Sequence, residues 1–368
     1  MEEGKLVSAE LSFARPRAQD RLFCHAIVRC FLPVLQSCAT QSLPQLGRRG
    51  VLAAIQIKDW GSMTTLTTAE LRGYQQISGK NGSIMVIACD QRGGIRKILA
   101  STPAEQAKIT DTMLGDTKSD VVRYLASQAP CVLLDPVCAV PRVVEEAALP
   151  RDVALLIGLD ASGYDTDASG HYISRLAPGI NARKVRELGG TGGKIMVYLR
   201  ADHPEANRHN MAIIHQCIED FAKEDLLLVV EFLTYALPGE DAAAYKTKFP
   251  SLIEGGTRLC LDAGAKVLKL PYPGTAQSCA AITAMCGSVP WSVLSAGVDH
   301  ETFIGQVEIA MANGASGVIA GRSLWKDCVS LNRAQQRDLL VSKAVPRLKQ
   351  IQAILERYPR NLQRAANG

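Results

Sequence analysis

Short apolar runs rich in β-branched residues recur along the chain after residue 63, and most are separated by enough residues for a helix. Eight of these runs have the length of buried strands: Ile84 to Ala88, Cys131 to Leu134, Val153 to Leu159, Ile195 to Leu199, Leu226 to Leu233, Lys266 to Leu270, Trp291 to Leu294 and Gly317 to Ala320. Near-continuous apolar strands that alternate with helices are typical of a parallel sheet covered by helices. Eight of them in one chain predict an α/β fold, a single (β/α)₈ TIM barrel.

The segments between these runs carry helical periodicity. The pattern predicts helices over Pro103 to Leu125, Ala182 to Leu188, Asn207 to Glu224, Ser251 to Ala263, Ala276 to Cys286, His300 to Ala312, and Ala334 to Tyr358 with Pro346 inside. A further helix is predicted to start soon after Met63, with Thr68 as its cap.

Residues 1–62 differ from the rest of the chain. They have little periodicity and carry eight basic against five acidic residues. An Arg-rich organelle-targeting peptide is one interpretation, but Glu2, Glu3, Glu10 and Asp20 count against it. We expect residues 1–62 to be a poorly structured N-terminal extension and residues 63–368 to be the barrel domain.

A doubly wound open sheet is the competing architecture, and it would place a glycine-rich phosphate loop after its first strand. The residues that follow Ile84 to Ala88 lack the G-x-G-x-x-G spacing. The glycine cluster before Lys194 has Leu188 and Ile195 where a Walker motif needs Gly and Ser or Thr. We interpret this cluster as a helix stop and a loop that leads into the fourth strand.

Composition excludes several classes of protein. The chain is 47% hydrophobic, 21% charged and 5% aromatic, with no apolar run long enough to span a membrane. The net charge of +5 is spread along the chain, which argues against nucleic acid as the main partner. Eleven cysteines without a C-x-x-C pair or a secretory signal favour a reducing cytoplasm, and most lie in apolar runs, so a catalytic cysteine is disfavoured.

Polar or charged residues mark the end of every predicted strand, where barrel enzymes place their chemistry. In order along the chain they are Asp90, Asp135, Asp160, Tyr198 with Arg200, Glu231, Lys269, Ser295 and Arg322. Glu231 and Lys269 interrupt apolar strands, where an unpaired charge is costly. Lys194, which opens the fourth strand, is a third such ionisable group. Each residue taken alone also has a structural explanation, as a buried ion pair or a helix cap.

Taken together, the three buried ionisable groups point to covalent chemistry. A lysine that is desolvated next to other cations has a lowered pKa, and its free amine attacks a carbonyl carbon to form a Schiff base. Lys269 supplies such a nucleophile, Lys194 a second cation, and Glu231 a group for proton transfer.

The last two strands predict an anion site. Ser295-Ala296-Gly297 and Ala320-Gly321-Arg322 are small-residue turns whose backbone N–H groups can approach a phosphate. Arg322 would add a bidentate cation. The alternative is that these glycines only allow tight strand-to-helix turns.

Longer motifs now support a family resemblance. They are Cys89-Asp90-Gln91-Arg92-Gly93, Leu133-Leu134-Asp135-Pro136, Lys194 with Arg200-Ala201-Asp202, Val230-Glu231, Val267-Leu268-Lys269-Leu270, Trp291 through Val298, and Gly314 through Trp325. They resemble the class I tagatose-bisphosphate aldolases, a family that includes the sulfofructosephosphate aldolases. The resemblance implies a metal-independent, cofactor-free barrel that cleaves a ketose phosphate to dihydroxyacetone phosphate and an aldehyde through a lysine Schiff base.

The resemblance also assigns roles. It implies that Lys269 is the Schiff-base lysine, Glu231 the acid/base, Lys194 the assisting cation and Asp90 the carboxylate that handles the hydroxyl at the bond being broken. Phosphate and substrate binding are assigned to Gln91, Arg92, Asp135, Arg200, Ser295, Gly297, Gly321 and Arg322. One departure is Pro271, where family members carry Glu two residues after the lysine.

Three functions follow as hypotheses. The first is a class I aldolase acting on tagatose 1,6-bisphosphate, with glyceraldehyde 3-phosphate as the aldehyde, or alternatively on sulfofructose 1-phosphate with release of sulfolactaldehyde. The second is a metal-dependent aldolase or isomerase, which the scattered histidines make improbable. The third is a non-catalytic phosphosugar sensor. The expected partner is a small sugar phosphate, and a homo-oligomer is compatible with the sequence.

Overall fold

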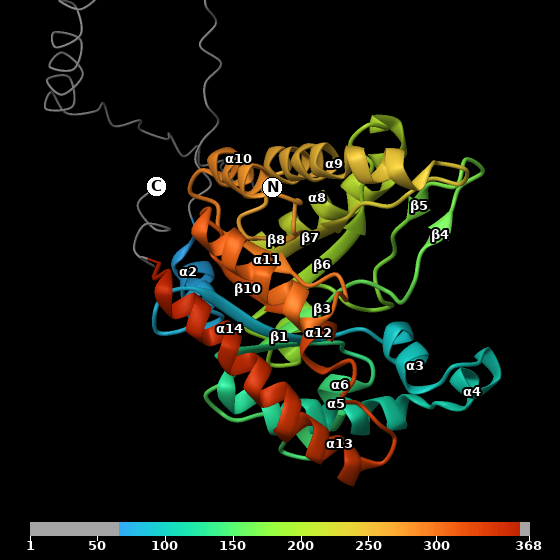
Figure 1. The fold of residues 1–368 in the computed structure, drawn as a ribbon, viewed down its shortest axis with the longest axis vertical. Coiled ribbons are helices and arrows are strands. Elements are labelled where there is room, and N and C mark those ends of the chain that lie inside the picture. Colours follow the sequence, from blue (N-terminus) through green and yellow to red (C-terminus); the bar gives the residue numbers. More distant parts are fainter. Residues whose placement is uncertain (1–65, 361–368) are drawn as a thin grey trace, which may run out of the picture. The chain divides into compact units, whose positions relative to one another are not determined.

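The computed structural model describes residues 66–360, so the expectations for residues 1–62 lie outside the described part of the chain. Eight parallel strands close into a barrel in the order β1, β10, β9, β8, β7, β6, β3, β2, and helices surround it (Figure 1). The predicted (β/α)₈ barrel is confirmed.

The strands lie close to their predicted positions. The barrel consists of β1 (Ile84–Cys89), β2 (Cys131–Leu134), β3 (Ala154–Gly158), β6 (Gly192–Tyr198), β7 (Leu227–Leu233), β8 (Leu268–Pro271), β9 (Trp291–Leu294) and β10 (Gly317–Ala320), and a separate antiparallel hairpin consists of β4 (Asp165–Thr166) and β5 (Tyr172–Ile173). The largest difference is in β6, which includes two glycines expected in a loop. A Cβ at Gly192 would lie 2.4 Å from the carbonyl oxygen of Leu227, so this strand pair needs glycine there.

The helices alternate with the strands. They are α2 (Thr68–Gln76), α3 (Gly93–Leu99), α4 (Pro103–Lys108), α5 (Asp111–Leu125), α6 (Ala139–Glu145), α7 (Ala182–Glu187), α8 (Arg208–Lys223), α9 (Ala242–Asp262), α10 (Ala276–Cys286), α11 (His300–Ala312), α12 (Arg322–Trp325), α13 (Arg333–Leu339) and α14 (Val345–Arg357). None of the helices that the structure describes is long and apolar enough to cross a membrane.

Four helix predictions are wrong in detail, one of them because α9 begins at Ala242, nine residues before the expected Ser251. The single helix expected over Pro103 to Leu125 is two helices, because the backbone is extended at Ile109 and Thr110 caps α5. Thr67 rather than Thr68 caps α2, where it forms a capping box with Glu70. The helix expected from Ala334 to Tyr358 is divided by a π-helical segment over residues 340–344.

The buried hydrophobic residues form two clusters, and alternate residues of a strand belong to different clusters. In β1, Met85 and Ile87 belong to the cluster that contacts the surrounding helices, whereas Ile84, Val86 and Ala88 belong to the smaller cluster with partners from the other strands. Successive strand residues point to opposite faces, so this smaller cluster fills the interior of the barrel.

Helix α2 closes the amino-terminal end of the barrel (Figure 1). Its Tyr74 and Ile77 join the interior cluster. The buried carboxylate of Glu70 pairs with Lys266 Nζ at 2.6 Å, which ties the helix to the chain just before β8. The open end is therefore the one where the strands finish.

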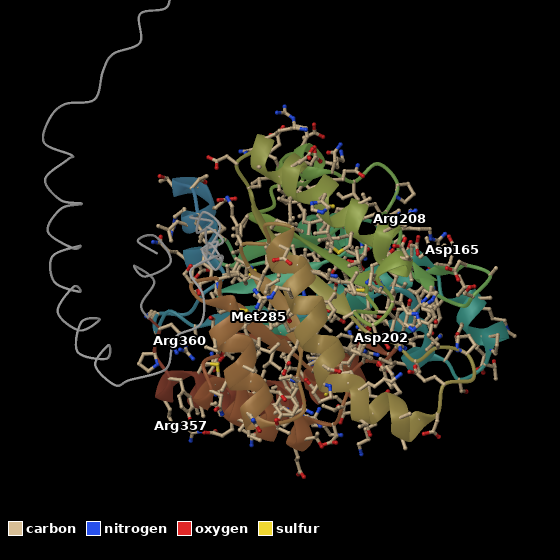
Figure 2. The ribbon with its side chains drawn as sticks, turned by 90° about the horizontal axis from the view of Figure 1, so that it is seen from above. Asp165, Asp202, Arg208, Met285, Arg357 and Arg360 are labelled. Atoms are coloured by element: carbon tan, nitrogen blue, oxygen red, sulfur yellow. The ribbon has the colours of Figure 1, made fainter. Side chains whose placement is uncertain are left out.

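The loops at the carboxyl ends of the strands carry the β4–β5 hairpin. Tyr164 stacks on Tyr172 with ring centroids 3.7 Å apart, and Tyr172 stacks on Tyr235 at 4.0 Å. Figure 2 shows Asp165 of this hairpin on the side of the molecule opposite Arg357, the last residue of α14. The stacked rings attach the hairpin to the end of β7.

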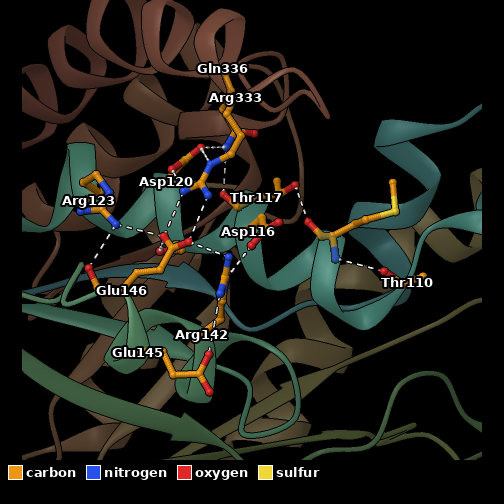
Figure 3. Close-up of polar contacts among 12 residues, drawn as sticks. Thr110, Asp116, Thr117, Asp120, Arg123, Arg142, Glu145, Glu146, Arg333 and Gln336 are labelled. Carbon is orange, nitrogen blue, oxygen red and sulfur yellow. Dashed lines mark hydrogen bonds and ion pairs between the residues drawn. The ribbon is translucent and has the colours of Figure 1, made fainter.

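An ion-pair cluster joins the carboxyl-terminal helices to α5 and α6 (Figure 3). Arg333 of α13 donates to both oxygens of Asp120, at 2.9 and 2.5 Å, and to both oxygens of Glu146, at 3.0 Å each. Asp120 is only 3% exposed, and Arg333 is the partner in its ion pair. The hydrogen bonds from Arg333 are the main cause that lowers the pKa of Glu146 to about 2.

Replacing Arg333 with Ala is expected to lower the free energy of unfolding by about 1.5–3 kcal/mol at pH 7, because a buried carboxylate loses its charged donors. A carboxyl group that has a lower pKa in the folded than in the unfolded state stabilises the fold at pH values above its unfolded-state pKa. This contribution is lost as the pH falls through its folded-state pKa. The difference between wild type and variant should therefore shrink as the pH is lowered from 7 toward 3. Urea unfolding at several pH values measures this, and Arg337→Ala, which removes a pair with the adjacent Asp338, is the control.

Candidate active site

The candidate site lies at the carboxyl ends of the strands, where the inward-facing positions become charged. Ile84, Val86 and Ala88 point inward along β1, and Asp90 is the next residue in that alternation. In β7 and β8 the same alternation runs from Leu227 and Val229 to Glu231, and from Val267 to Lys269. The apolar interior therefore ends in a layer of charged side chains.

Lys194 is at the centre of this layer. Its ammonium nitrogen lies 2.6 Å from Asp160 Oδ1, 2.7 Å from Asp90 Oδ2 and 3.4 Å from Glu231 Oε2, and its side chain is 2% exposed. The ammonium group has three donors and here meets three carboxylates. A buried cation in such a setting is fully paired.

Lys269 joins the same cluster through Glu231. Its Nζ lies 2.9 Å from Glu231 Oε2, the oxygen that also faces Lys194. The two residues are paired across β7 and β8, which places both side chains on one face at one level of the barrel. The cluster thus combines three carboxylates with two ammonium groups.

The charges set the protonation states of the cluster. Burial lowers the pKa of the Lys194 ammonium, but Asp160, Asp90 and Glu231 outweigh it and hold that pKa well above its ordinary value. Burial raises the pKa of the Asp90 carboxyl, but Lys194 and Lys269 outweigh it and hold that pKa well below its usual range. Lys194 is therefore a fixed cation and Asp90 an ionised base.

Glycine makes room for Asp90 in the cluster. Gly158 of β3 pairs with Lys194 of β6 in the barrel register. A Cβ on Gly158 would lie 3.3 Å from the Cβ of Asp90 and 3.5 Å from its Oδ2. A side chain at this position would push Asp90 away from the ammonium it contacts.

A cavity of about 240 Å³ opens above Lys269. Seven of the predicted site residues line it: Asp90, Gln91, Glu231, Lys269, Ser295, Gly321 and Arg322. An apolar wall of Leu233, Phe249, Pro271, Leu294 and Ile319 faces them. A lining that combines a few polar groups with apolar side chains is typical of small-molecule sites.

The turns after β9 and β10 meet at the edge of this cavity. Ala296 and Gly297 both have positive φ, 48° and 85°, so the turn folds back sharply. A Cβ on Gly297 would lie 2.9 Å from the Cζ of Arg322, so the missing side chain lets the guanidinium lie against the turn. Arg322 takes part in none of the ion pairs found among residues 66–360.

Arg200 does not reach the cavity. Its guanidinium donates to both oxygens of Asp202, to both oxygens of Glu240 and to the carbonyl of Tyr235, all at 2.7 to 3.1 Å. A guanidinium has five N–H donors, so none remains for a substrate anion. Arg200 instead holds the chain after β6 to the chain after β7.

Asp135 and Arg92 lie beside the cavity rather than in it. Asp135 is buried, forms an ion pair with Lys118 and accepts from the backbone N–H of Cys138. Arg92 donates to Ser162 Oγ and to the carbonyl of Asp160, at 2.8 and 3.1 Å, with one nitrogen 3.8 Å from Asp135. Among the described residues its buried Nη1 has no hydrogen-bond partner.

Sequence reasoning missed Asp160 as part of the site. The sequence marks Asp160 as a polar residue at a strand end and indicates no function for it. The signal was present, because Asp160 follows an interior glycine by two residues, just as Asp90 follows Ala88.

Pro271 does line the cavity, so the departure from the family pattern bears on the substrate pocket itself.

Cysteine and metal chemistry find no support in residues 66–360. All eight described cysteines are buried, and burial raises the pKa of the Cys89 thiol to about 12. Within that part of the chain, no group of three or more His, Cys, Asp or Glu side chains is arranged to hold a metal ion. Where three carboxylates do converge, an ammonium group lies between them.

The model of the DeoC/LacD family aldolases matches residues 84–327, which span the barrel from β1 to just beyond α12. The chain belongs to this family. The resemblance inferred from the strand-end motifs is confirmed, and this DeoC/LacD family member is an aldolase, a carbon–carbon lyase.

Curated relatives match this family member over most of its length. Tagatose 1,6-diphosphate aldolase of Listeria monocytogenes serotype 4a (strain HCC23) is 27% identical over 305 residues, covering 76% of this chain and 88% of the relative. The protein of the same name from Staphylococcus aureus (strain bovine RF122 / ET3-1) is 26% identical over 294 residues, covering 73% and 88%.

Solved structures share the fold of this family member. A fructose-bisphosphate aldolase from Slackia heliotrinireducens DSM 20476 matches with a TM-score of 0.57 and 18% identity over 81% of this chain and 88% of that chain. A Schiff base forming fructose-1,6-bisphosphate aldolase matches with a TM-score of 0.51 and 17% identity over 77% and 98%.

Proposed function

We propose that this aldolase cleaves a ketose phosphate through a Schiff base on Lys269, without a metal ion or other cofactor. The observation that carries the proposal is the Lys269–Glu231 pair. The amine lies 2.9 Å from a carboxylate at the floor of a cavity that both residues line. A nucleophile and a proton acceptor are thus within reach of one bound carbonyl group.

Glu231 is the group that prepares the amine. It accepts the ammonium proton of Lys269, and the free amine then attacks the ketone carbon to form a carbinolamine. Glu231 returns the proton to the carbinolamine hydroxyl, which leaves as water and gives a protonated imine. Lys194, 3.4 Å from the same oxygen, stabilises the carboxylate each time it is ionised.

Asp90 is the base for the cleavage step. It takes the proton from the hydroxyl on the carbon beyond the bond to be broken. The carbon–carbon bond then breaks, its electron pair neutralises the imine as an enamine, and the aldehyde leaves. Protonation of the enamine carbon and addition of water release the ketone phosphate and regenerate the lysine. Two cations near Asp90 keep it ionised for this role.

Tagatose 1,6-bisphosphate is the proposed substrate, with dihydroxyacetone phosphate and glyceraldehyde 3-phosphate as products. The names of the curated relatives support this substrate. Arg322 and the Ser295–Gly297 turn support binding of a phosphate at the cavity edge, together with Gly321. Gln91 lines the cavity, where it supports binding of a sugar hydroxyl.

Borohydride trapping tests the proposal. The protein is incubated with EDTA and, separately, with tagatose 1,6-bisphosphate, sulfofructose 1-phosphate and dihydroxyacetone phosphate, then reduced and mapped by mass spectrometry. Tagatose 1,6-bisphosphate and dihydroxyacetone phosphate are expected to label Lys269, because a reduced imine is a stable secondary amine. Turnover of the ketose should continue in EDTA, since no metal takes part in the steps above.

Four outcomes would contradict parts of this proposal. Label on another lysine would move the nucleophile. Loss of turnover in EDTA that zinc restores would place the reaction in the metal-dependent class. Binding of the ketose phosphates without label or turnover would favour a phosphosugar sensor, and turnover of sulfofructose 1-phosphate alone would change the substrate.

A further inference from the structure

Asp160 contacts the catalytic cluster without lining the substrate cavity. Its Oδ1 lies 2.6 Å from Lys194 Nζ, the shortest of the three carboxylate contacts to that ammonium, and its side chain is 19% exposed. We propose that Asp160 is a positioning residue for the aldol cleavage: it fixes the Lys194 ammonium so that its two remaining donors face Asp90 and Glu231. The inference rests on the proposed function and adds a residue to its machinery.

The backbone around Asp160 is held on both sides. The N–H of Leu159 donates to the carbonyl of Lys194 at 2.9 Å, and the N–H of Ala177 donates to the carbonyl of Leu159 at 2.8 Å. The N–H of Ala161 donates to the carbonyl of Arg175 at 2.8 Å. The extended backbone at Asp160 is therefore held by hydrogen bonds on both sides. This fixes the position from which its side chain contacts the Lys194 ammonium.

Arg92 adds a link from the loop after β1. Its Nη2 donates to the carbonyl of Asp160 at 3.1 Å, and its Nε donates to Ser162 Oγ at 2.8 Å. The residue two before it, Asp90, accepts from the same ammonium as Asp160. The segments after β1 and β3 are thus joined twice, once through Arg92 and once through Lys194.

The carboxylate of Asp160 also changes the electrostatic potential at the catalytic groups. Burial raises the pKa of Asp160, the charges of Asp90 and Glu231 add to this, and Lys194 opposes it. Like charges act on each other equally, so an ionised Asp160 makes protonation of Asp90 easier. The other titratable groups that face it are Tyr198 on β6 and Cys217 on α8.

Replacement of Asp160 by Asn gives two expected changes. The value of kcat for the ketose phosphate should fall by about 10- to 100-fold with KM nearly unchanged, because a charge-assisted hydrogen bond to the assisting cation is lost. The acid limb of the pH profile of kcat should move to lower pH by about one unit, because Asp90 loses a neighbouring negative charge. Lys194 keeps two carboxylate partners, so the variant should fold.

The experiment compares wild type, Asp160→Asn, Asp160→Glu and Asp165→Asn in full pH profiles of ketose phosphate cleavage. Asp160→Glu keeps the charge and should return the acid limb to the wild-type position with partial recovery of kcat. Asp165 is exposed in the β4–β5 hairpin and pairs with Arg175, so its variant should match wild type. Trapping of dihydroxyacetone phosphate on Lys269 is measured for each variant and should stay complete in all of them.

The outcomes separate this inference from the proposed function. If wild type neither cleaves nor traps, the proposed function fails. If wild type cleaves and traps but Asp160→Asn keeps the wild-type acid limb, even with a lower kcat, the positioning role is overturned. An acid limb in Asp160→Glu that matches that of Asp160→Asn overturns it as well.

Discussion

Lys269→Ala is expected to lower kcat for ketose phosphate cleavage by about 10⁴- to 10⁶-fold, the scale seen when the covalent nucleophile of an enzyme is removed. Without the amine there is no imine to receive the electron pair of the breaking bond. The fold should survive, because Glu231 keeps a second ammonium, that of Lys194, at 3.4 Å. Single-turnover cleavage assays measure the loss, and thermal unfolding checks the fold.

Two further variants make the Lys269 result interpretable. Lys269→Met keeps the length and the apolar stem of the side chain but removes the amine, so it should be as inactive as the Ala variant with a smaller effect on stability. Lys223→Ala, at the exposed end of α8, should match wild type. Substantial cleavage by either Lys269 variant would rule out the Schiff base at this residue.

The barrel could be predicted because its strands are buried on both faces and so appear as apolar runs in the sequence. The same property made the reactive groups visible. Glu231 and Lys269 are the charged residues of strands that are otherwise apolar, and a charge in that position needs a partner or a function. Their pairing across neighbouring strands follows from the register, which the order of strands in a barrel largely determines.

Long-range partners could not be predicted. Arg200 and Arg322 both follow strands, and the sequence treats them alike. Arg200 is neutralised by Glu240, which is 40 residues away in the sequence and reaches it through the loop after β7. Asp135 is likewise paired with Lys118 from the preceding helix. Whether a strand-end charge is available to a ligand depends on such partners, which only the folded chain brings together.

Helix interruptions were also beyond the sequence pattern. The run from Pro103 to Leu125 has a continuous helical period, but Thr110 accepts from the N–H of Met113 and starts a new helix. A capping threonine and an interior threonine are the same residue type, so periodicity alone does not separate them. The break lies away from the cavity and involves none of the residues that line it.

Arg322→Ala is expected to weaken kcat/KM for a phosphorylated ketose by about 10- to 150-fold, since a charge-assisted, partly desolvated contact contributes about 1.5–3 kcal/mol. If the guanidinium holds the phosphate equally in the ground and transition states, KM should carry the loss, and if it also orients the carbonyl toward Lys269, kcat should fall too. Inorganic phosphate should inhibit wild type competitively and the Ala variant far less. Arg322→Lys should lie between them, because it keeps the charge but not the two-pronged donor. The turn at Gly297 lies against this guanidinium, so an unchanged phosphate inhibition constant in Arg322→Ala would remove both the arginine and the turn from the proposed phosphate site.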